Sequence, residues 1–184
     1  MFRVPGSKNL ERGTWNAVTV SYNSNMKCRL ALPLLALLIA SGCASREVEK
    51  DLQITEVRTG WYDSGIVEGG KNKLVPSVTF KLQNVSPADI SSVQVNAVFR
   101  RVGEDEAWGE HFINAIDRNG LAAGAAGNAL VLRSPLGYTG TQPRLQMLQN
   151  KEFVDAKVEI YGKHGSRAWV KMGEYQIDRQ LLTE

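Results

Sequence analysis

Apolar and polar residues alternate with a period of two in two neighbouring stretches of the chain. Residues 77–83 read SVTFKLQ and residues 91–101 read SSVQVNAVFRR. This alternation is typical of β-strands that bury one face. Between them, NVSPAD is a predicted turn, because Pro87 fixes φ and the flanking Asn84 and Asp89 can hydrogen-bond the local backbone. We expect the two strands as antiparallel neighbours or as members of two packed sheets.

Shorter strand candidates follow the same period later in the chain. They are residues 108–113, 129–133 and 154–160, and a final pair, 168–172 and 174–178, with Gly173 as a bulge or bend. The segment NGLAAGAAGN, residues 119–128, separates the first two. It lacks the Lys-Ser/Thr ending of a P-loop and any dinucleotide-binding fingerprint, so we predict a flexible connection.

One segment has a helical pattern. PRLQMLQN, residues 143–150, places Pro143 in the first turn and Leu145 three residues before Leu148, which predicts a short helix. About seven strands and one short helix predict an all-β fold, an antiparallel immunoglobulin-like sandwich. A small barrel is the alternative. We expect one such domain over residues 52–184, which is enough chain for a single core.

A resemblance supports the sandwich. The run VTFKLQNVSPADISSVQVNAVFR, followed by Gly120-Leu121 and by Gly124 before a new strand, resembles the small bacterial FxLYD-type and late-embryogenesis-abundant-like β-sandwich domains. Their pattern is a strand that ends in Asn-x-Ser, then a turn, then a strand of alternating valines. The resemblance spans residues 74–132, about a third of the chain, and the Phe-x-Leu-Tyr-Asp stretch itself is absent. It implies an envelope-associated sandwich and no catalytic residue.

Residues 26–42 have the three parts of a secretory signal. Lys27 and Arg29 precede an apolar run of 11 residues, and Ser41-Gly42 stand before Cys43. The run is far shorter than the roughly 20 residues that span a bilayer. The arrangement resembles the lipobox of bacterial lipoproteins, which implies that a diacylglycerol is attached to Cys43, that the signal is cut before it, and that the new amine is acylated. A general secretory signal cut elsewhere is the alternative.

The lipobox resemblance also implies a location. Three acyl chains anchor a protein stably, whereas one chain binds only marginally. Ala44 stands where an aspartate is associated with retention at the inner membrane, which implies an outer-membrane, periplasm-facing lipoprotein, or a cell-membrane one if there is no outer membrane. The charged stretch CASREVEKD, residues 43–51, is a predicted lipidated tether. Residues 1–25 do not resemble the start of a signal, and we interpret them as a mis-assigned upstream start before Met26.

Charge excludes one class of partner. The chain has 22 basic and 19 acidic side chains, but residues 1–42 hold five of the basic and one of the acidic ones. The part that starts at Cys43 therefore has 17 basic and 18 acidic side chains. Nucleic-acid affinity depends on basic residues that neutralise phosphates. We predict a membrane attachment and an envelope protein partner, and no nucleic acid.

Cysteine and histidine positions leave little room for catalysis. Cys28 lies in the signal and Cys43 is the lipid attachment point, so we expect no disulfide and no cysteine nucleophile in the domain. His111 and His164 have no second histidine at ligand spacing, and we interpret both as surface polar residues. No G-x-S-x-G elbow is present, and the acidic run 104–106 lacks the spacing of an EF-hand. The sequence predicts no enzyme, no metal and no cofactor.

Three aromatic residues stand in predicted loops. Trp61 and Tyr62 precede Asp63-Ser64-Gly65, and Tyr138 lies in PLGYTG. Rigid aromatic side chains dominate binding hot spots, so these three are candidate partner contacts. The alternative is that they cover the open ends of the sandwich.

These observations predict a non-catalytic, lipid-anchored accessory protein of the cell envelope that binds a partner through its loops or an exposed strand edge. The alternative is a periplasmic lipoprotein that binds a small ligand or a glycan, with Trp61, Tyr62 and Trp108 as stacking residues. A hydrolase would need a Ser/His/Asp or carboxylate cluster that the fold brings together.

Overall fold

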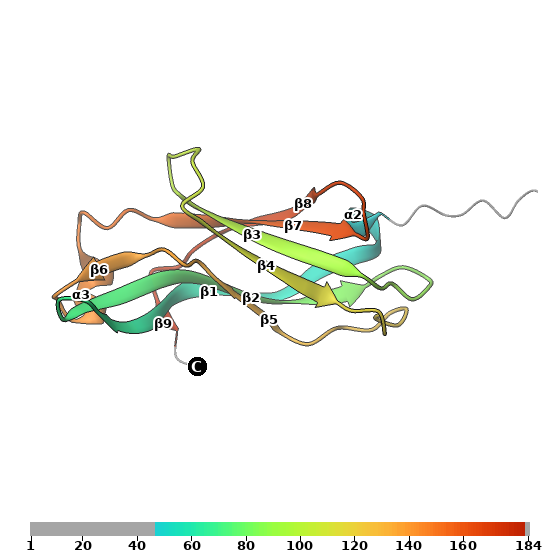
Figure 1. The fold of residues 1–184 in the computed structure, drawn as a ribbon, viewed down its shortest axis with the longest axis horizontal. Coiled ribbons are helices and arrows are strands. Elements are labelled where there is room, and N and C mark those ends of the chain that lie inside the picture. The colour runs from blue at the N-terminus through green and yellow to red at the C-terminus, as the bar shows by residue number, and fades with distance from the viewer. Residues whose placement is uncertain (1–46, 183–184) are drawn as a thin grey trace, which may run out of the picture. The chain divides into compact units, whose positions relative to one another are not determined.

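The computed structural model describes residues 47–182, in which two β-sheets pack face to face (Figure 1). The five-stranded sheet has the order β5-β2-β1-β9, with β6 also paired to β2, and the four-stranded sheet has the order β4-β3-β7-β8. The strands are β1 (Leu52–Val67), β2 (Lys71–Asn84), β3 (Val93–Arg101), β4 (Gly109–Ile116), β5 (Leu130–Arg133), β6 (Tyr138–Gly140), β7 (Ala156–His164), β8 (Val170–Gln176) and β9 (Leu181–Leu182). The described helices are α2 (Val48–Asp51) and α3 (Arg144–Gln149). The predicted all-β sandwich is confirmed, with nine described strands and two short helices in place of about seven strands and one helix.

The apolar residues of the alternating stretches form the core between the sheets. In β2, Val78, Phe80 and Leu82 are at most 1% exposed, whereas Thr79 and Lys81 between them are half-buried on the outer face. In β3, every second residue from Val93 to Phe99 is fully buried. Burial of apolar surface contributes about 25 cal/mol per Å². The packing of the two inner faces therefore stabilises the sandwich.

The chain crosses from one sheet to the other at both ends of the sandwich. Hairpins join β1 to β2, β3 to β4 and β7 to β8, within one sheet each. The crossings from β2 to β3 and from β4 to β5 lie at the end that carries α2 (Figure 1). The crossing from β6 to β7 passes through α3 at the other end. We call these the α2 end and the α3 end.

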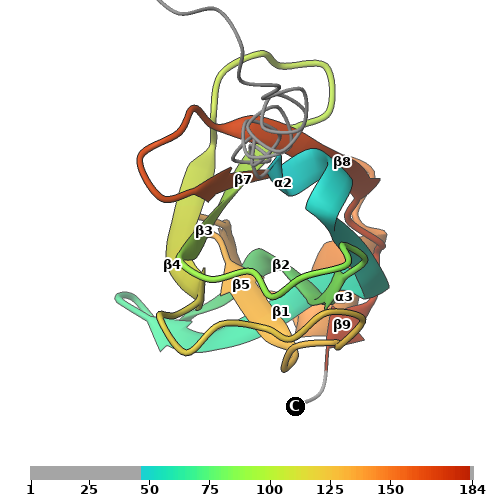
Figure 2. The same cartoon turned by 90° about the vertical axis from the view of Figure 1, so that its right-hand side faces the viewer.

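Different contacts close the two sides of the sandwich. On one side β4 approaches β5, and the backbone N–H of Arg133 donates to Nδ1 of His111 at 2.9 Å. On the other side α2 lies against β8 and β1 (Figure 2). The Val48 side chain of α2 packs in the core. The prediction of a tether up to Asp51 is therefore wrong from Val48 onward. The predicted segments 1–25 and 26–42, and Cys43, lie outside the described residues.

The longest strand, β1, is absent from the sequence prediction because a β-bulge interrupts its alternation. Paired positions are three residues apart on β1, at Thr55 and Arg58, but two apart on β2. The first intervening residue, Glu56, has a φ of 52°. A bulge adds one residue to one strand and shifts the faces of the residues that follow. As a result, Trp61 faces the core and Tyr62 faces outward.

The strand pair predicted at residues 168–178 is one strand, β8. Ile160 of β7 pairs with Gly173, and the next residue, Tyr161, pairs with Lys171, so Met172 is an extra residue. The predicted bulge beside Gly173 is confirmed, but the break into two strands is wrong, because a bulge leaves the ladder intact on both sides. The other predicted strands and the predicted helix are present with bounds that differ by a few residues.

The side chain of Asn84, the last residue of β2, holds the α2 end together. It is fully buried, and its Nδ2 donates to the carbonyl oxygens of Ala88, Leu121 and Ala122 at 2.9–3.1 Å. Its Oδ1 accepts from the backbone N–H of Ser86 at 3.0 Å and from the Ser86 hydroxyl at 2.7 Å. Ala88 belongs to the crossing from β2 to β3, and the other two carbonyls belong to the crossing from β4 to β5. One amide therefore joins both crossings.

The backbone of Asn84 also fixes the glycine-rich segment. The N–H of Gly124 donates to the carbonyl of Asn84, and the N–H of Asn84 donates to the carbonyl of Ala125, each at 2.9 Å. The N–H of Gly127 donates to Leu82 at 2.8 Å. Gly124 has a φ of 74°, a conformation that favours glycine. The segment is hydrogen-bonded to the end of β2 and is not the flexible connection that the sequence predicts.

We expect Asn84→Ala to lower the free energy of unfolding by about 3 kcal/mol or more, because it leaves several buried groups without a hydrogen-bond partner. Urea denaturation measures the loss. The matched control is Asn114→Ala, an exposed asparagine in β4 whose removal should change stability by no more than about 0.5 kcal/mol. Equal effects of the two substitutions would contradict the role of Asn84.

Candidate functional site

Trp61, predicted as a partner contact in a loop, lies at the centre of an aromatic cluster inside the α3 end. The cluster consists of Trp61, Trp108, Tyr138 and Phe153. The ring centroids of Trp61 and Phe153 are 4.6 Å apart in an edge-to-face arrangement, and those of Tyr138 and Phe153 are 4.5 Å apart. Such aromatic pairs contribute beyond the area they bury. The cluster joins β1, β6 and the segments just before β4 and β7.

The loop positions predicted for the three aromatic candidates are wrong. Trp61 is 0% exposed in β1, and among the described residues no hydrogen-bond acceptor meets its Nε1. Tyr138 lies in β6, and its hydroxyl donates to the carbonyl of Val154 at 3.2 Å. Burial raises the pKa of Tyr138. Tyr62 lies on the outer face of β1, so the structure does not gather Trp61, Tyr62 and Trp108 on one accessible surface.

We expect Trp61→Ala to lower the free energy of unfolding by about 3–5 kcal/mol, because it opens a cavity in the aromatic cluster. Trp61→Phe should cost much less, since it keeps an aromatic ring and removes an N–H that has no acceptor. Thermal and urea denaturation of both variants measure the difference. A stable Trp61→Ala variant would show that the cluster does not support the fold.

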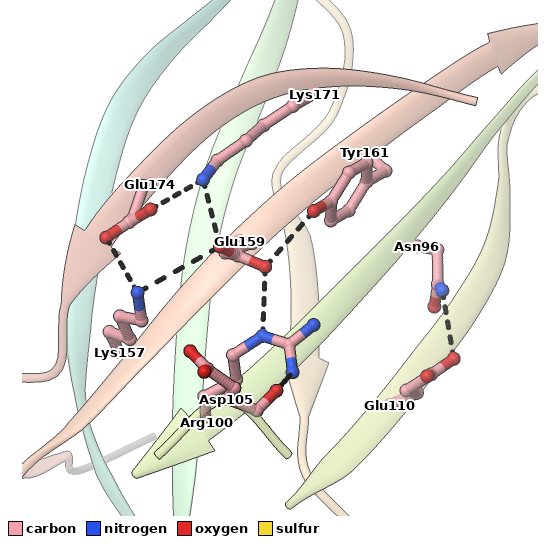
Figure 3. Close-up of polar contacts among 9 residues, drawn as sticks. All are labelled: Asn96, Arg100, Asp105, Glu110, Lys157, Glu159, Tyr161, Lys171 and Glu174. Carbon is pink, nitrogen blue, oxygen red and sulfur yellow. Dashed lines mark hydrogen bonds and ion pairs between the residues drawn. The ribbon is translucent and has the colours of Figure 1, made fainter. Parts of the chain in front are cut away.

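The outer face of the four-stranded sheet carries an ionic cluster formed by Arg100, Lys157, Glu159, Lys171 and Glu174 (Figure 3). Glu159 in β7 is at its centre. It accepts from Nε of Arg100 at 3.1 Å and from Nζ of Lys171 at 2.9 Å. The hydroxyl of Tyr161 donates to Glu159 as well, at 3.1 Å. Cross-strand pairing places these side chains together, because β3, β7 and β8 are neighbours.

The cluster holds Glu159 in its charged form. The hydrogen bond from Lys171, with those from Arg100 and Tyr161, lowers the pKa of Glu159 from 4.5 to about 2, although burial acts in the opposite direction. Proton transfer near neutral pH needs a group whose pKa is close to that pH. Glu159 is therefore suited to cross-linking three strands and not to general acid or base catalysis.

We expect the cluster to make stability depend on pH. Because the pKa of Glu159 is about 2 in the folded protein and 4.5 as the ordinary value, its contribution is complete above about pH 4.5 and is lost as the pH falls toward 2. The loss amounts to about 3 kcal/mol. Urea denaturation across this range measures it. Glu159→Gln should make the free energy of unfolding depend less on pH, whereas Glu106→Gln, at an exposed position, should leave the dependence unchanged. The same pH dependence in both variants would contradict the assignment of the effect to Glu159.

Beside the ionic cluster, two large aromatic side chains are exposed. Phe112 in β4 is 51% exposed and Trp169, just before β8, is 40% exposed. Their ring centroids are 6.1 Å apart and their planes meet at 83°. Nζ of Lys163 lies 4.8 Å from the centroid of the Trp169 ring, a cation–π contact. We call Phe112 and Trp169 the aromatic pair.

Polar side chains border the aromatic pair on the same sheet. Nε2 of Gln94 donates to Oδ1 of Asn114 at 3.1 Å. Nδ2 of Asn96 donates to Glu110, also at 3.1 Å, as Figure 3 shows. Asn96 pairs with Phe112 across the strands. An aromatic centre with a polar border is the composition of protein interfaces.

Sequence reasoning missed the aromatic pair, although one signal was present. In β4, Glu110 and Asn114 face solvent, and Phe112 falls between them in the same phase of the alternation. An aromatic residue in the polar phase of a strand is therefore exposed. Trp169 gave the same signal, since it shares the phase of Lys171 in the predicted strand 168–172, although it lies just before β8 in the structure.

The histidines and carboxylates of residues 47–182 form no group of three that could hold a metal ion. His111 is half-buried and bonds to the backbone of Arg133. His164 is the last residue of β7 and is also half-buried. Neither of the two described helices is long and apolar enough to cross a membrane.

Comparison with known proteins gives no family for this chain: no protein-family model matches it, and no curated protein shows significant similarity to it.

Proposed function

We propose that this protein is a non-catalytic, lipid-anchored accessory protein of the cell envelope, and that it acts as an interaction module through the outer face of its four-stranded sheet. The observation that carries the proposal is the exposed aromatic pair. Large aromatic side chains dominate the binding energy of interfaces once a partner excludes water from them. The partner is an envelope protein.

The signal sequence supports the membrane attachment. Cys43, preceded by a basic start and an apolar run, is the proposed lipid attachment point. Only a few residues separate it from Val48, which packs in the core. The domain would therefore stay close to the membrane, in the outer membrane facing the periplasm or in the cell membrane of an organism without an outer membrane.

The ionic cluster supports a fixed binding surface. Arg100, Glu159 and Lys171 connect neighbouring strands through hydrogen bonds and ion pairs. Side chains held in this way lose little conformational entropy when a partner binds, and a preorganised surface binds more tightly. The aromatic pair is thus presented on a sheet whose strands are cross-linked beside it.

We expect a photoreactive amino acid at Asn114, an exposed residue of β4 two positions from Phe112, to cross-link the full-length protein, in cells, to one envelope protein. Mass spectrometry of the cross-linked product identifies it. The double variant Phe112→Ser and Trp169→Ser should no longer recover this protein. Leu145→Ser is the matched control, because Leu145 is 62% exposed on α3, away from the aromatic pair.

The anchor is tested separately. Cys43→Ser should abolish the incorporation of radiolabelled palmitate into the protein, since it removes the thiol that is acylated. Loss of cross-linking only in the aromatic double variant would support the interaction face. A folded double variant that still recovers the same partner would overturn it, whatever the result for Cys43.

A further inference from the structure

One edge of the four-stranded sheet is open. β4 is the outer strand of this sheet, so one of its two sides has no neighbouring strand among the residues that the structure describes. Figure 2 shows β4 at the margin of its sheet. β4 pairs with β3 in regular register from Gly109 to Asn114, and the extra residue Ala115 ends the regular part. An unpaired strand edge is a template for another strand.

Hydrogen bonds on the other side of β3 show how its backbone groups alternate. The N–H of Val102 donates to the carbonyl of Asp155 at 2.7 Å, and the N–H of Gly165 donates to the carbonyl of Ser92 at 2.9 Å. The register of β3 with β7 has no irregularity between these two bonds. Successive residues of an antiparallel strand bond to opposite sides. The even-numbered residues of β3 therefore bond to β7, and the odd-numbered ones bond to β4.

The same alternation fixes the direction of the backbone groups of β4. Odd-numbered residues of β3 stand opposite odd-numbered residues of β4, as Val95 stands opposite Ile113. The even-numbered residues of β4 therefore direct their N–H and carbonyl groups to the open side. These residues are Glu110, Phe112 and Asn114. Their side chains lie on the outer face of the sheet, where all three are exposed.

The other described sheet edges carry features that hinder the addition of a strand. β9, β6 and β5 have only two, three and four residues. The extra residue Met172 interrupts β8, and α2 lies against that strand. Irregularities at Glu56 and between Asp63 and Ile66 interrupt β1. Residues 109–114 of β4, GEHFIN, have no bulge, lysine or proline, which are the usual means of blocking an edge.

We propose that a second copy of this chain adds its own β4 to this edge. The two β4 strands pair antiparallel about a two-fold axis that passes beside Phe112. The N–H and carbonyl groups of Glu110, Phe112 and Asn114 bond between the copies. In this register Phe112 stands opposite Phe112 of the second copy, and Glu110 stands opposite Asn114 of the second copy.

The side chains of the edge complement one another in this register. The two Phe112 rings become direct cross-strand neighbours, an arrangement that stabilises antiparallel strands. The carboxylate of Glu110 faces the amide of Asn114, whose Nδ2 can donate to it. The two Glu110 side chains stand at opposite ends of the paired stretch, so no like charges are opposed. A second copy supplies all these groups by symmetry, whereas a different partner would need a strand with the same pattern.

The pairing also changes the binding surface. The axis between antiparallel neighbours is perpendicular to the sheet, so the outer faces of both copies point the same way. Two four-stranded sheets become one continuous sheet, and the two aromatic pairs lie on the same face of it. A partner that contacts both copies gains affinity without any new kind of contact. The inference does not depend on the proposed function, because it concerns the backbone edge of β4 and a second copy of the chain.

The test measures the mass of the full-length protein in a neutral detergent by sedimentation equilibrium over a range of concentrations. We expect an equilibrium between monomer and dimer. Asn114→Pro should raise the dissociation constant of the dimer about tenfold or more, because each copy loses an N–H that bonds to the other. The N–H of Asn114 points away from β3, so this edge position tolerates proline and urea denaturation should show a folded variant. Asn114→Ala is the matched control, since it keeps the N–H and should raise the constant much less.

A second pair of variants tests the register. Phe112→Cys places two thiols beside the two-fold axis, in a hydrogen-bonded pair whose Cα atoms are about 5.5 Å apart, which a disulfide can span. Mild oxidation should therefore link the two copies covalently. Glu110→Cys is the control, because each new thiol would face Asn114 of the other copy. Non-reducing electrophoresis measures the linked fraction.

A wild-type protein that stays monomeric at all concentrations would overturn the proposal. Equal dissociation constants of Asn114→Pro and Asn114→Ala would also overturn it, because association through the detergent-embedded anchors would then explain the dimer. If Asn114→Pro does not fold, the cysteine variants decide. A covalent dimer of Phe112→Cys alone would support the pairing, and equal linkage of both cysteine variants, or none, would overturn it. All these outcomes are independent of whether an envelope protein binds the aromatic pair.

Discussion

The fold depends on one buried amide. In a sandwich, the segments that cross from one sheet to the other carry backbone N–H and C=O groups that have no partner in the hydrogen-bond ladders of the strands. These groups need other partners if the crossings are to be stable. Here two of these passages meet at the side chain of Asn84, which donates to carbonyls of both. The alternative partner for those carbonyls is water, which the buried position of Asn84 excludes. The relative placement of the two sheets at the α2 end follows from this contact.

The two ends and the two outer faces of the sandwich divide their roles. The α3 end is filled with aromatic rings around Trp61, and the α2 end is filled with hydrogen bonds around Asn84. Both are structural. The outer face of the four-stranded sheet carries the aromatic pair beside the ionic cluster. Function is therefore expected on the flat faces of this molecule, in contrast to the loops that usually bind in sandwiches.

The sequence predicted the parts of the fold that depend on local alternation. The strands around Phe80 and Phe99, the turn after Asn84 and the bulge beside Gly173 are all visible in the order of apolar residues. What it missed has a physical cause in each case. The bulge at Glu56 interrupts the alternation of β1. The faces of Trp61 and Tyr62 could therefore not be predicted from the sequence pattern. The ionic cluster joins strands that are distant in the sequence, and only strand order brings Arg100 of β3 to Glu159 of β7.

The bulge also determines how the length of this chain can vary among related proteins. Removal of one residue between Thr55 and Trp61 would reverse the phase of the strand. The indole of Trp61 would then face solvent, and the phenol of Tyr62 would face the core. An insertion there would do the same. The turn at residues 68–70, by contrast, can lengthen without altering any face. Homologues should thus tolerate insertions and deletions in that turn, and the segment around Glu56 should keep a constant number of residues even where their identities change.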